Sequence, residues 1–426
     1  MTGSSLAADV DDVEQAVHTG ALPGWHQVES HVVDAYERYR SRTSGVVADY
    51  IPALAAADPE LFGISVAEVG GAVHVAGEAD VEFSVQSISK AFVYAMVCEE
   101  FGHRLVRERV GVNNTGLSFN SVIAIELNDG HPMNLMVNAG ALATTALVPR
   151  ATPAEQWERI RTGLSRFAGR ELALDGEVYH SEMLTNQRNQ AIARLLESYG
   201  RIDLDPLDVV DTYTRQCSLR VSARDIAIMG ATLADGGVNP VTGDRVVSPH
   251  VCRDTLSVLA ATGMYERSGE WLFEIGLPAK SGVSGGIVAI APGKGAIGTF
   301  LPRLDSAGNS VRGQRATAYL SRTLGLNLFA SAAHRTDEGE TPRGTVSQCI
   351  PNRVHFKPCP RGRVKPVFGA APDHPGPRQR DQSQQVSSEP HKRASLCRCR
   401  SRSRIVEKDR TTDDPASGRI TMCPVK

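Results

Sequence analysis

Hydrophobic residues in the first part of the chain recur at helical spacing and then at strand spacing. Between residues 27 and 56 the apolar positions recur every three or four residues, which predicts a helix ending at the turn Tyr50-Ile51-Pro52. Two short β-prone runs follow, Ile64 to Val69 and Ala72 to Ala76, and two consecutive glycines separate them. Because such a glycine junction suits a tight turn between antiparallel strands, we predict a β-hairpin here.

A strongly apolar helix is predicted directly after this hairpin. Residues 87–101 carry apolar side chains at i, i+3 and i+4 spacing, and Gly102 stands where a helix stop is expected. Ser87 opens this helix. The next stretch, about 103–260, is mostly helical in pattern and is interrupted by Gly- and Asn-rich breaks.

Strand patterns return further along the chain. Three β-prone runs are separated by Gly, Pro and Lys turns, and they are Glu270 to Ile275, Gly286 to Ile290 and Ala296 to Leu301. A last amphipathic helix is expected at about 310–324. Strands at both ends of a helical middle indicate an α+β fold, in which helices flank an antiparallel sheet and a mostly helical subdomain is inserted.

The composition changes after residue 330. Residues 331–426 hold about 19 Lys or Arg against about 10 Asp or Glu, and about 11 of the 23 prolines, without a sustained apolar period. Such a segment cannot bury enough apolar surface to fold alone. We therefore divide the chain into a polar extension at 1–24, a folded domain at 25–330 and a basic, disordered tail at 331–426.

The rest of the sequence has the composition of a globular protein. No apolar run approaches the length of a membrane span, and the N-terminus carries acidic residues where a secretory signal is basic and then apolar. Cys98, Cys217 and Cys252 are isolated, and the tail pair Cys397 and Cys399 lacks the spacing of a zinc site. We therefore expect a cytoplasmic protein without a disulfide, a metal or another cofactor.

Ser87 and Lys90 form the sharpest chemical feature of the sequence. Residues three apart lie on the same face of a helix, so the hydroxyl and the amine can meet. A serine hydroxyl needs a base, and a lysine amine serves if its pKa falls from about 10.4 to 7–8, at a cost of about 3–4 kcal/mol. Burial and a second nearby cation can cause this shift, and Lys280 is the candidate cation.

The segment after Lys280 can complete such a site. The N-terminus of the helix provides a favourable field for negative charge that develops near Ser87. The backbone N–H of Ser87 and one from the Gly282-Val283 segment can together hold a carbonyl oxygen, each donor being worth about 3–4 kcal/mol in the transition state.

These patterns also have a plainer explanation. A helix-capping serine followed by a solvated lysine is commoner than a nucleophile with its base. The context favours chemistry here, because Ser87 opens a buried helix after a hairpin and the run Lys280-Ser281-Gly282 begins a strand about 190 residues later. Serine acylases of the penicillin-binding class require this arrangement.

Seven runs of residues resemble the serine-dependent glutaminase family in content, order and spacing. They are DYIPAL (49–54), FSVQSISKAF (83–92), MVNAGAL (136–142), SEMLTNQRN (181–189), DTYTRQCS (211–218), GMYE (263–266) and GLPAKSGVSGGI (276–287). The resemblance covers about residues 25–330 and departs from the family at no motif position. The tail has no counterpart in the family.

The resemblance implies a β-lactamase or penicillin-binding-protein-like fold and hydrolysis of L-glutamine to L-glutamate and ammonia. It implies that Ser87 is the nucleophile, that Lys90 is its base, and that Tyr50 and Tyr265 lie near the reacting centre. It also implies an oxyanion hole made by the backbone N–H groups of Ser87 and Val283. The side chains implied in substrate binding are Asn138, Glu182, Asn189, Tyr213 and Tyr265, and Lys280 and Gly282 have supporting places.

These residue types suit a free amino acid as substrate. Glu182 can pair with its ammonium group, while Asn138, Asn189 and the tyrosines can donate to its carboxylate. Taken singly, each residue is more often a solvated, turn or core residue. The sequence leaves open whether Tyr265 or Tyr50 passes a proton to the leaving ammonia, and the preference for glutamine over asparagine rests on the resemblance.

Other functions stay open at this stage. A β-lactamase or esterase would use Ser87 and Lys90 on a larger substrate and has little need of a carboxylate that binds ammonium. A non-catalytic binder would be an acylatable sensor domain or a nucleic-acid binder that uses the arginine-rich tail. We do not expect nucleic-acid binding, because the tail has few aromatics to stack on bases and no folded nucleic-acid motif. The tail can equally be a disordered appendage or out-of-frame translation.

We expect water as the second reactant and, on base rates, a homo-oligomer such as a dimer or tetramer.

Overall fold

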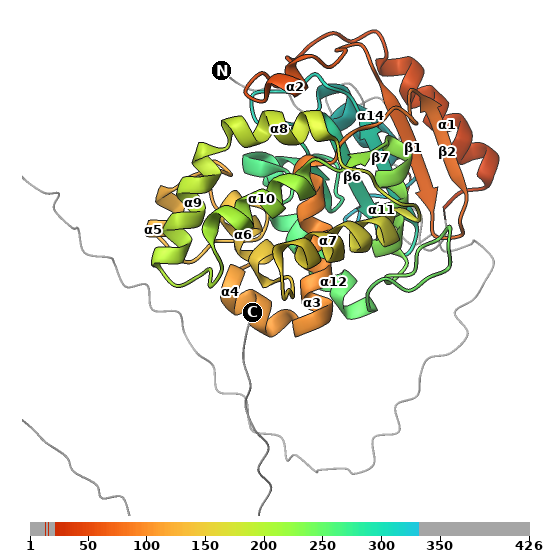
Figure 1. The fold of residues 1–426 in the computed structure, drawn as a ribbon. Coiled ribbons are helices and arrows are strands. Elements are labelled where there is room, and N and C mark those ends of the chain that lie inside the picture. The colour runs from red at the N-terminus through yellow and green to blue at the C-terminus, as the bar shows by residue number, and fades with distance from the viewer. Residues whose placement is uncertain (1–12, 14–15, 17–21, 332–426) are drawn as a thin grey trace, which may run out of the picture. The chain divides into compact units, whose positions relative to one another are not determined.

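The described part of the chain contains an antiparallel sheet of five strands, which lies to the right of a group of helices in Figure 1. The computed structural model describes residues 13, 16 and 22–331. The strand order in the sheet is β2-β1-β7-β6-β5. These strands are β1 (Gly63–Glu68), β2 (Val73–Gly77), β5 (Ala279–Ser281), β6 (Gly286–Ala291) and β7 (Gly295–Phe300).

Strands from the two ends of the domain meet in this sheet. β1 pairs with β2 in a hairpin and with β7 on its other side, where Gly63 lies opposite Phe300 and Glu68 lies opposite Gly295. The predicted hairpin is therefore confirmed, and so is the sheet that the C-terminal strands complete. The α+β fold class is confirmed with them.

Helices cover both faces of the sheet (Figure 1). One face packs against α11 (Ala223–Ala234), and the other packs against α1 (Trp25–Tyr39) and α14 (Val311–Thr323). The predicted last helix at 310–324 is α14. Because both faces are covered, the strands β6 and β7 are buried along their whole length and their sequence reads as a continuous apolar run.

Glycines let α11 approach the sheet closely. A Cβ atom on Gly298 of β7 would lie 2.2 Å from the carbonyl oxygen of Ala223, and one on Gly230 of α11 would lie 2.6 Å from the Cβ of Ala296. Larger residues would force the helix away from the strands, so these positions fix the distance between the two layers.

The helical subdomain is built around α3 (Ser89–Phe101). From Ser89 to Cys98 every residue of α3 except Met96 is buried, and Gly102 ends the helix with φ +77°. The predicted buried helix and its glycine stop are thus confirmed. The remaining helices are α2 (Pro52–Ala55), α4 (His103–Val110), α5 (Ile123–Glu126), α6 (Asn138–Leu147), α7 (Pro153–Ala168), α8 (Gly176–Thr185), α9 (Gln187–Ser198), α10 (Pro206–Cys217), α12 (Pro249–Thr262) and α13 (Ser268–Glu274).

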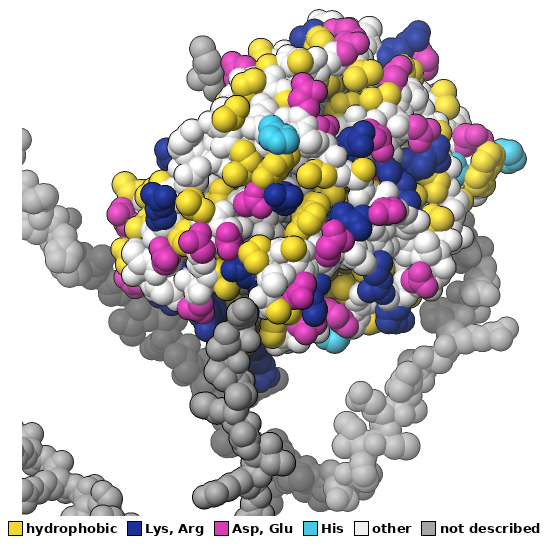
Figure 2. Space-filling model, in the orientation of Figure 1, with side chains coloured by type: hydrophobic (Ala, Val, Ile, Leu, Met, Phe, Trp, Pro, Cys, Tyr) yellow, Lys and Arg dark blue, Asp and Glu magenta, His cyan; other side chains and the backbone are white. Residues whose placement is uncertain are grey.

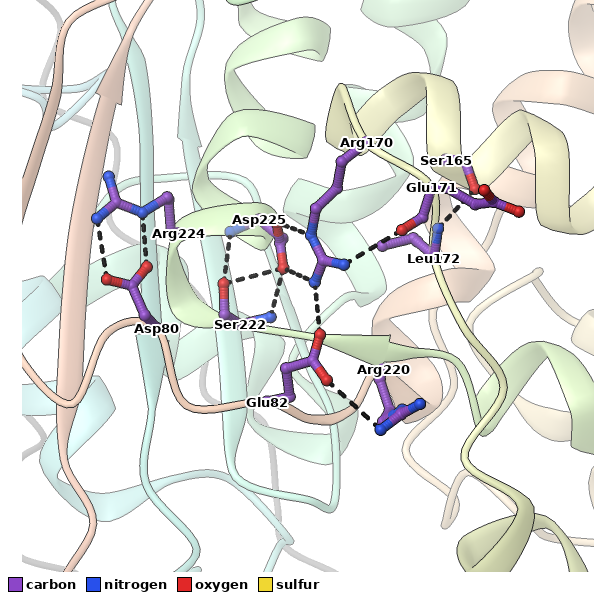
Figure 3. Close-up of polar contacts among 10 residues, drawn as sticks. All are labelled: Asp80, Glu82, Ser165, Arg170, Glu171, Leu172, Arg220, Ser222, Arg224 and Asp225. Carbon is purple, nitrogen blue, oxygen red and sulfur yellow. Dashed lines mark hydrogen bonds and ion pairs between the residues drawn. The ribbon is translucent and has the colours of Figure 1, made fainter.

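A short ribbon of two strands leads the chain into α3. β3 (Phe83–Ser84) pairs with β4 (Arg220–Val221), and a network of ion pairs surrounds it (Figure 3). Arg170 donates two hydrogen bonds to Asp225, at 2.8 and 2.6 Å, and one to Glu82 at 3.0 Å. Asp225 in turn caps the start of α11. The network therefore fastens β3 to both α11 and the segment that follows α7.

One predicted strand is wrong. The run Glu270 to Ile275 is helical, because it falls in α13 and its cap. Trp271 and Ile275 are buried while Phe273 is 87% exposed, which looks like the alternation of a strand. Residues four apart also share one face of a helix, so the same pattern fits both structures. The third C-terminal strand is instead the short β5.

The first predicted helix is too long. α1 ends at Tyr39, and the chain then runs without helix to Pro52, apart from an isolated bridge between Val46 and Leu304. Gly45 adopts φ +97°, which a helix does not allow. The apolar residues near the end of the predicted range pack against other elements, so their spacing does not report a helix.

Parts of the domain prediction fall on residues that the structure does not describe. The predicted tail lies outside the described residues from 332 onward, and most of the extension at 1–24 does so too. Among the described residues, no helix is long and apolar enough to cross a membrane. Figure 2 shows acidic and basic side chains interspersed on the face that it presents.

Candidate active site

Ser87 lies in a tight turn at the start of the buried helix α3. A 3₁₀ turn, Gln86–Ile88, precedes α3 directly, and Ser87 is 7% exposed. The chain enters this turn from β3, and the N–H of Val85 donates to the carbonyl of Leu219 at 2.8 Å. Ser87 is therefore held between a fixed strand and the N-terminus of a helix, where the helix dipole favours negative charge.

Gln86 holds the turn in a strained backbone conformation. Its φ is +49°, in the left-handed region that side-chain-bearing residues rarely adopt. Its amide nitrogen donates to Glu182 Oε2 and to Ser84 Oγ, each at 3.3 Å. Gly282 packs closely here, since a Cβ on it would lie 3.1 Å from the carbonyl oxygen before Gln86. Tyr265 also has a positive φ, +54°, and strain of this kind collects at functional sites.

Lys90 is buried one helical turn after Ser87, on the same face. Its Nζ donates to the carbonyl oxygen of Met136 at 3.0 Å and to Asn138 Oδ1 at 2.8 Å. Burial lowers the pKa of Lys90 from 10.5 to about 8, and the nearby Cys217 and Glu182 oppose this shift. The pKa of the amine is therefore close enough to physiological pH for a fraction of the molecules to carry Lys90 in the neutral form that can accept a proton.

Lys280 lies in β5 and is fully buried. Its Nζ donates to the carbonyl oxygen of Ser281 at 2.6 Å and lies 4.3 Å from the centre of the Tyr265 ring. Burial lowers the pKa of Lys280 well below its ordinary value, and the charge of Lys90 lowers it further. The sequence suggested that Lys280 acts on Lys90, whereas here burial is the main cause of the Lys90 shift.

Tyr265 joins Ser87 to β5. Its phenol donates to the carbonyl oxygen of Ser281 at 3.1 Å and is hydrogen-bonded to Ser87. Burial raises the pKa of Tyr265, and the hydrogen bond with Ser87 opposes part of this rise. The phenol is therefore uncharged at neutral pH and can both accept and donate a hydrogen bond.

Glu182 is a buried acid in α8, 7% exposed. Burial raises its pKa from 4.5 to about 7, while the hydrogen bond from Gln86 and the charge of Lys90 lower it. A cation placed beside a buried carboxylate of this pKa stabilises the charged form of the carboxylate. The site therefore offers a place for a positively charged group close to the Ser87 turn.

Amide side chains link Lys90 to the neighbouring helix α9. Asn138, at the start of α6, accepts from Lys90 and donates through its Nδ2 to Asn189 Oδ1 at 2.8 Å. The amide nitrogen of Asn189 is then the part of that group suited to donate elsewhere. Tyr213 of α10 is buried beside this chain, with the Lys90 Nζ 5.9 Å from its ring centre.

A cavity of about 190 Å³ brings most of these residues together; we call it the main pocket. Its walls are Tyr50, Ile51, Gln86, Ser87, Phe119, Asn120, Asn138, Glu182, Thr185, Asn186, Arg188, Asn189, Tyr213 and Val283. Tyr50 is 54% exposed, so it stands at the outer edge. Drug-sized ligands occupy pockets of about 300–1,000 Å³, so this volume suits a smaller molecule.

Sequence reasoning missed several lining residues, among them Gln86, Phe119 and Arg188. Gln86 stands inside the Ser87 motif, but its positive φ has no signal in the sequence. Phe119 and Arg188 come from a loop and a helix that the fold brings to the pocket. Within residues 22–331, no group of three His, Cys, Asp or Glu side chains is placed to hold a metal.

Comparisons with known proteins converge on one family. A family model described as Glutaminase matches residues 45–329, more than half of the chain. Glutaminase 2 of Yersinia pestis is 54% identical over 315 residues, which cover 74% of this chain and 93% of that protein. A solved structure of the probable glutaminase ybaS has a TM-score of 0.72 and 42% identity, and the match covers 72% of this chain and all of that one (100%). A structure of Mglu in its glutamate form has a TM-score of 0.69 and 40% identity, covering 73% and 72% of the two chains.

Proposed function

This chain belongs to the glutaminase family and is a glutaminase of β-lactamase-like fold, and we propose that it hydrolyses L-glutamine through an ester formed on Ser87. The observation that carries the proposal is the hydrogen-bonded arrangement around the Ser87 turn. Ser87 stands at the wall of a small pocket with a buried acid and is hydrogen-bonded to an uncharged phenol, and a buried amine of lowered pKa lies three residues further along on the same helical face.

The main pocket can bind a free amino acid at its charged end. Glu182 pairs with the α-ammonium of glutamine, which offsets the cost of burying both charges. Asn189 and Tyr213 donate to the α-carboxylate, and Asn138 keeps Asn189 oriented by holding its amide oxygen. The side-chain amide of glutamine then points toward Ser87. A β-lactam substrate would leave the buried Glu182 without a cation, so the acid favours the amino acid.

The first chemical step transfers the γ-glutamyl group to the enzyme. The Ser87 oxygen attacks the side-chain amide carbon, and the serine proton passes to the neutral amine of Lys90. The negative charge on the former carbonyl oxygen is held by the backbone N–H groups of Ser87 and Val283. A proton then reaches the amide nitrogen, the C–N bond breaks, and ammonia leaves an ester on Ser87.

The second step returns the serine. A water molecule attacks the ester carbon and gives up a proton to Lys90, the C–O bond to Ser87 breaks, and the serine oxygen regains its proton. Glutamate then leaves the pocket. The net reaction consumes one glutamine and one water and yields one glutamate and one ammonia.

We assign the proton relay to Tyr265 rather than to Tyr50. The phenol of Tyr265 is buried and hydrogen-bonded to Ser87, so it can hand a proton to a group that leaves from the serine side. Tyr50 is more than half exposed at the pocket edge, which suits contact with bound substrate better than proton transfer.

The direct test measures ammonia released from glutamine by Ser87→Ala and Lys90→Ala variants. Both should keep the fold, shown by an unchanged circular dichroism spectrum, and lose about 10³-fold or more in kcat. Ser198→Ala, at an exposed serine of α9, is the matched control and should be fully active. Ammonia release by Ser87→Ala at the wild-type rate would refute the proposal.

A further inference from the structure

A second, smaller cavity lies next to the main pocket. Its volume is about 60 Å³, against about 190 Å³ for the main pocket. It therefore has room for molecules of the size of water or ammonia. Its walls are Asn114, Thr115, Leu117, Phe119, Asn134, Met136, Val137, Ala261, Thr262, Tyr265, Glu266, Ser268 and Gly269.

The small cavity is lined by exposed residues at one end and by buried residues at the other. Ala261, Glu266 and Gly269 are exposed and mark its outer end, whereas Met136 and Tyr265 are buried and mark its inner end. Asn, Thr, Ser and Glu side chains line it along the way, so it offers hydrogen bonds to small polar molecules.

Two contacts join its inner end to the reaction. The carbonyl of Met136 accepts a hydrogen bond from Lys90, and the phenol of Tyr265 is hydrogen-bonded to Ser87. Ser87 itself lines only the main pocket, while Tyr265 lines only the small cavity. Phe119 lines both, and its ring contacts the Tyr265 ring with centroids 5.0 Å apart. This ring pair therefore separates the two spaces.

The two-step reaction can use such a second opening. After the first step the γ-glutamyl group still fills the main pocket, with its ammonium and carboxylate toward Glu182 and Asn189. Ammonia must nevertheless leave, and water must reach the same carbon, before glutamate can be released. A route on the Tyr265 side lets these small molecules exchange without opening the main pocket.

We propose that the small cavity is the passage by which ammonia leaves and the hydrolytic water enters, with the Phe119–Tyr265 ring pair at its inner end. The proposal rests on the ester mechanism stated above. The carboxylate of Glu266 at the outer end favours departure of ammonia as ammonium.

The test is to plug the passage without touching the main pocket. Gly269 is suited to this, because a Cβ there meets no atom within 4 Å and the residue lies in the first turn of α13. Gly269→Leu and Ala261→Leu are the plugging variants. Gly176→Leu is the matched control, since Gly176 begins α8, also meets nothing within 4 Å, and lines neither space.

The readouts are kcat, the affinity for glutamate and the partition of the ester between two nucleophiles, water and hydroxylamine. When the wild-type enzyme turns over glutamine in the presence of hydroxylamine, water should convert the ester to glutamate and hydroxylamine should convert it to γ-glutamyl hydroxamate. In the plugging variants kcat should fall by about tenfold, and the hydroxamate share should fall by a further factor of about three, because the larger nucleophile is excluded more than water. Glutamate binding measured by calorimetry and all values for Gly176→Leu should stay at wild-type levels.

The outcomes separate this proposal from the mechanism on which it rests. Unchanged kcat and hydroxamate share in both plugging variants would overturn the proposed passage. A loss of glutamate affinity as large as the loss of kcat would overturn it too. Ammonia release by Ser87→Ala at the wild-type rate would instead refute the ester on Ser87.

Discussion

Lys90 Nζ donates a hydrogen bond to the side-chain oxygen of Asn138 across 2.8 Å. The other end of the same amide donates to Asn189, which lines the main pocket. Lys90, which we assign as the base, is thus connected through one amide to a residue that we assign to substrate binding. A charge placed at position 138 therefore changes the pKa of the Lys90 amine directly.

Replacing Asn138 by aspartate tests this connection. A carboxylate 2.8 Å from the amine stabilises the charged form of Lys90, so its pKa rises from about 8. We expect the pH dependence of kcat/KM for Asn138→Asp to move to higher pH by at least about one unit. Asn120→Asp adds the same charge to the pocket wall without a contact to Lys90, and it should shift the profile less. An unshifted profile in Asn138→Asp would contradict the assignment of Lys90 as the base.

The wild-type enzyme should become more efficient as the pH rises through about 7 and about 8. Below about 7 Glu182 is protonated and cannot pair with an ammonium group, and below about 8 Lys90 is protonated and cannot accept the serine proton. Deprotonation of Glu182 and deprotonation of Lys90 therefore both raise kcat/KM, which should increase between pH 6 and about 9. Rates of ammonia release at low glutamine concentration across this range are the measurement. A kcat/KM that decreases over this range would be incompatible with these roles.

Glu182→Gln should stabilise the free protein at alkaline pH while it impairs catalysis. The pKa of Glu182 is raised in the folded state from 4.5 to about 7, so the folded protein holds this proton more tightly, and stability is lost as the pH rises from about 4.5 through about 7. The uncharged glutamine side chain at position 182 removes this loss of stability, which at pH 8 is of the order of 3 kcal/mol. Urea unfolding should show a much larger gain in stability at pH 8 than at pH 5. A gain of equal size at both values would mean that the charge is not its cause.

Tyr265→Phe and Tyr50→Phe should differ in kcat. Removing the Tyr265 phenol removes hydrogen bonds to Ser87 and to the Ser281 carbonyl, so kcat should fall by about 10²-fold or more, the range of general acid–base catalysis. Tyr50→Phe changes a half-exposed edge residue and should act mainly on KM. Steady-state kinetics on both variants decide between the tyrosines, and the reverse pattern would assign the relay to Tyr50.

Asp225→Asn should destabilise the protein far more than Asp80→Asn (Figure 3). Both carboxylates pair with an arginine through two hydrogen bonds, but the Asp225 side chain is 6% exposed and that of Asp80 is 67% exposed. Asp225 also accepts from the N–H and the hydroxyl of Ser222. Breaking a buried pair costs about 3–5 kcal/mol, and an exposed pair is worth about 1 kcal/mol or less. Urea unfolding measures both, and equal losses would show that burial is not what matters here.

Local sequence determined the elements whose signals lie within a few residues. The spacing in residues 87–101 is sufficient for a buried helix, and the two glycines after Val69 are sufficient for the hairpin. The Ser87 and Lys90 positions follow from helical geometry alone, because three residues nearly complete one turn. Where one pattern fits two structures, as in Glu270 to Ile275, local information fails and packing decides.

Only the tertiary structure decided the electrostatics of the site and its contacts. Ser87 meets Tyr265, and Lys90 meets Asn138, across long stretches of chain, so no local pattern specifies either contact. The pKa shifts of Lys90 and Glu182 depend on how much water the surrounding elements remove, and that quantity exists only once those elements have packed together. The sequence thus names the groups that we assign to the reaction, and the packed fold sets their protonation and their partners.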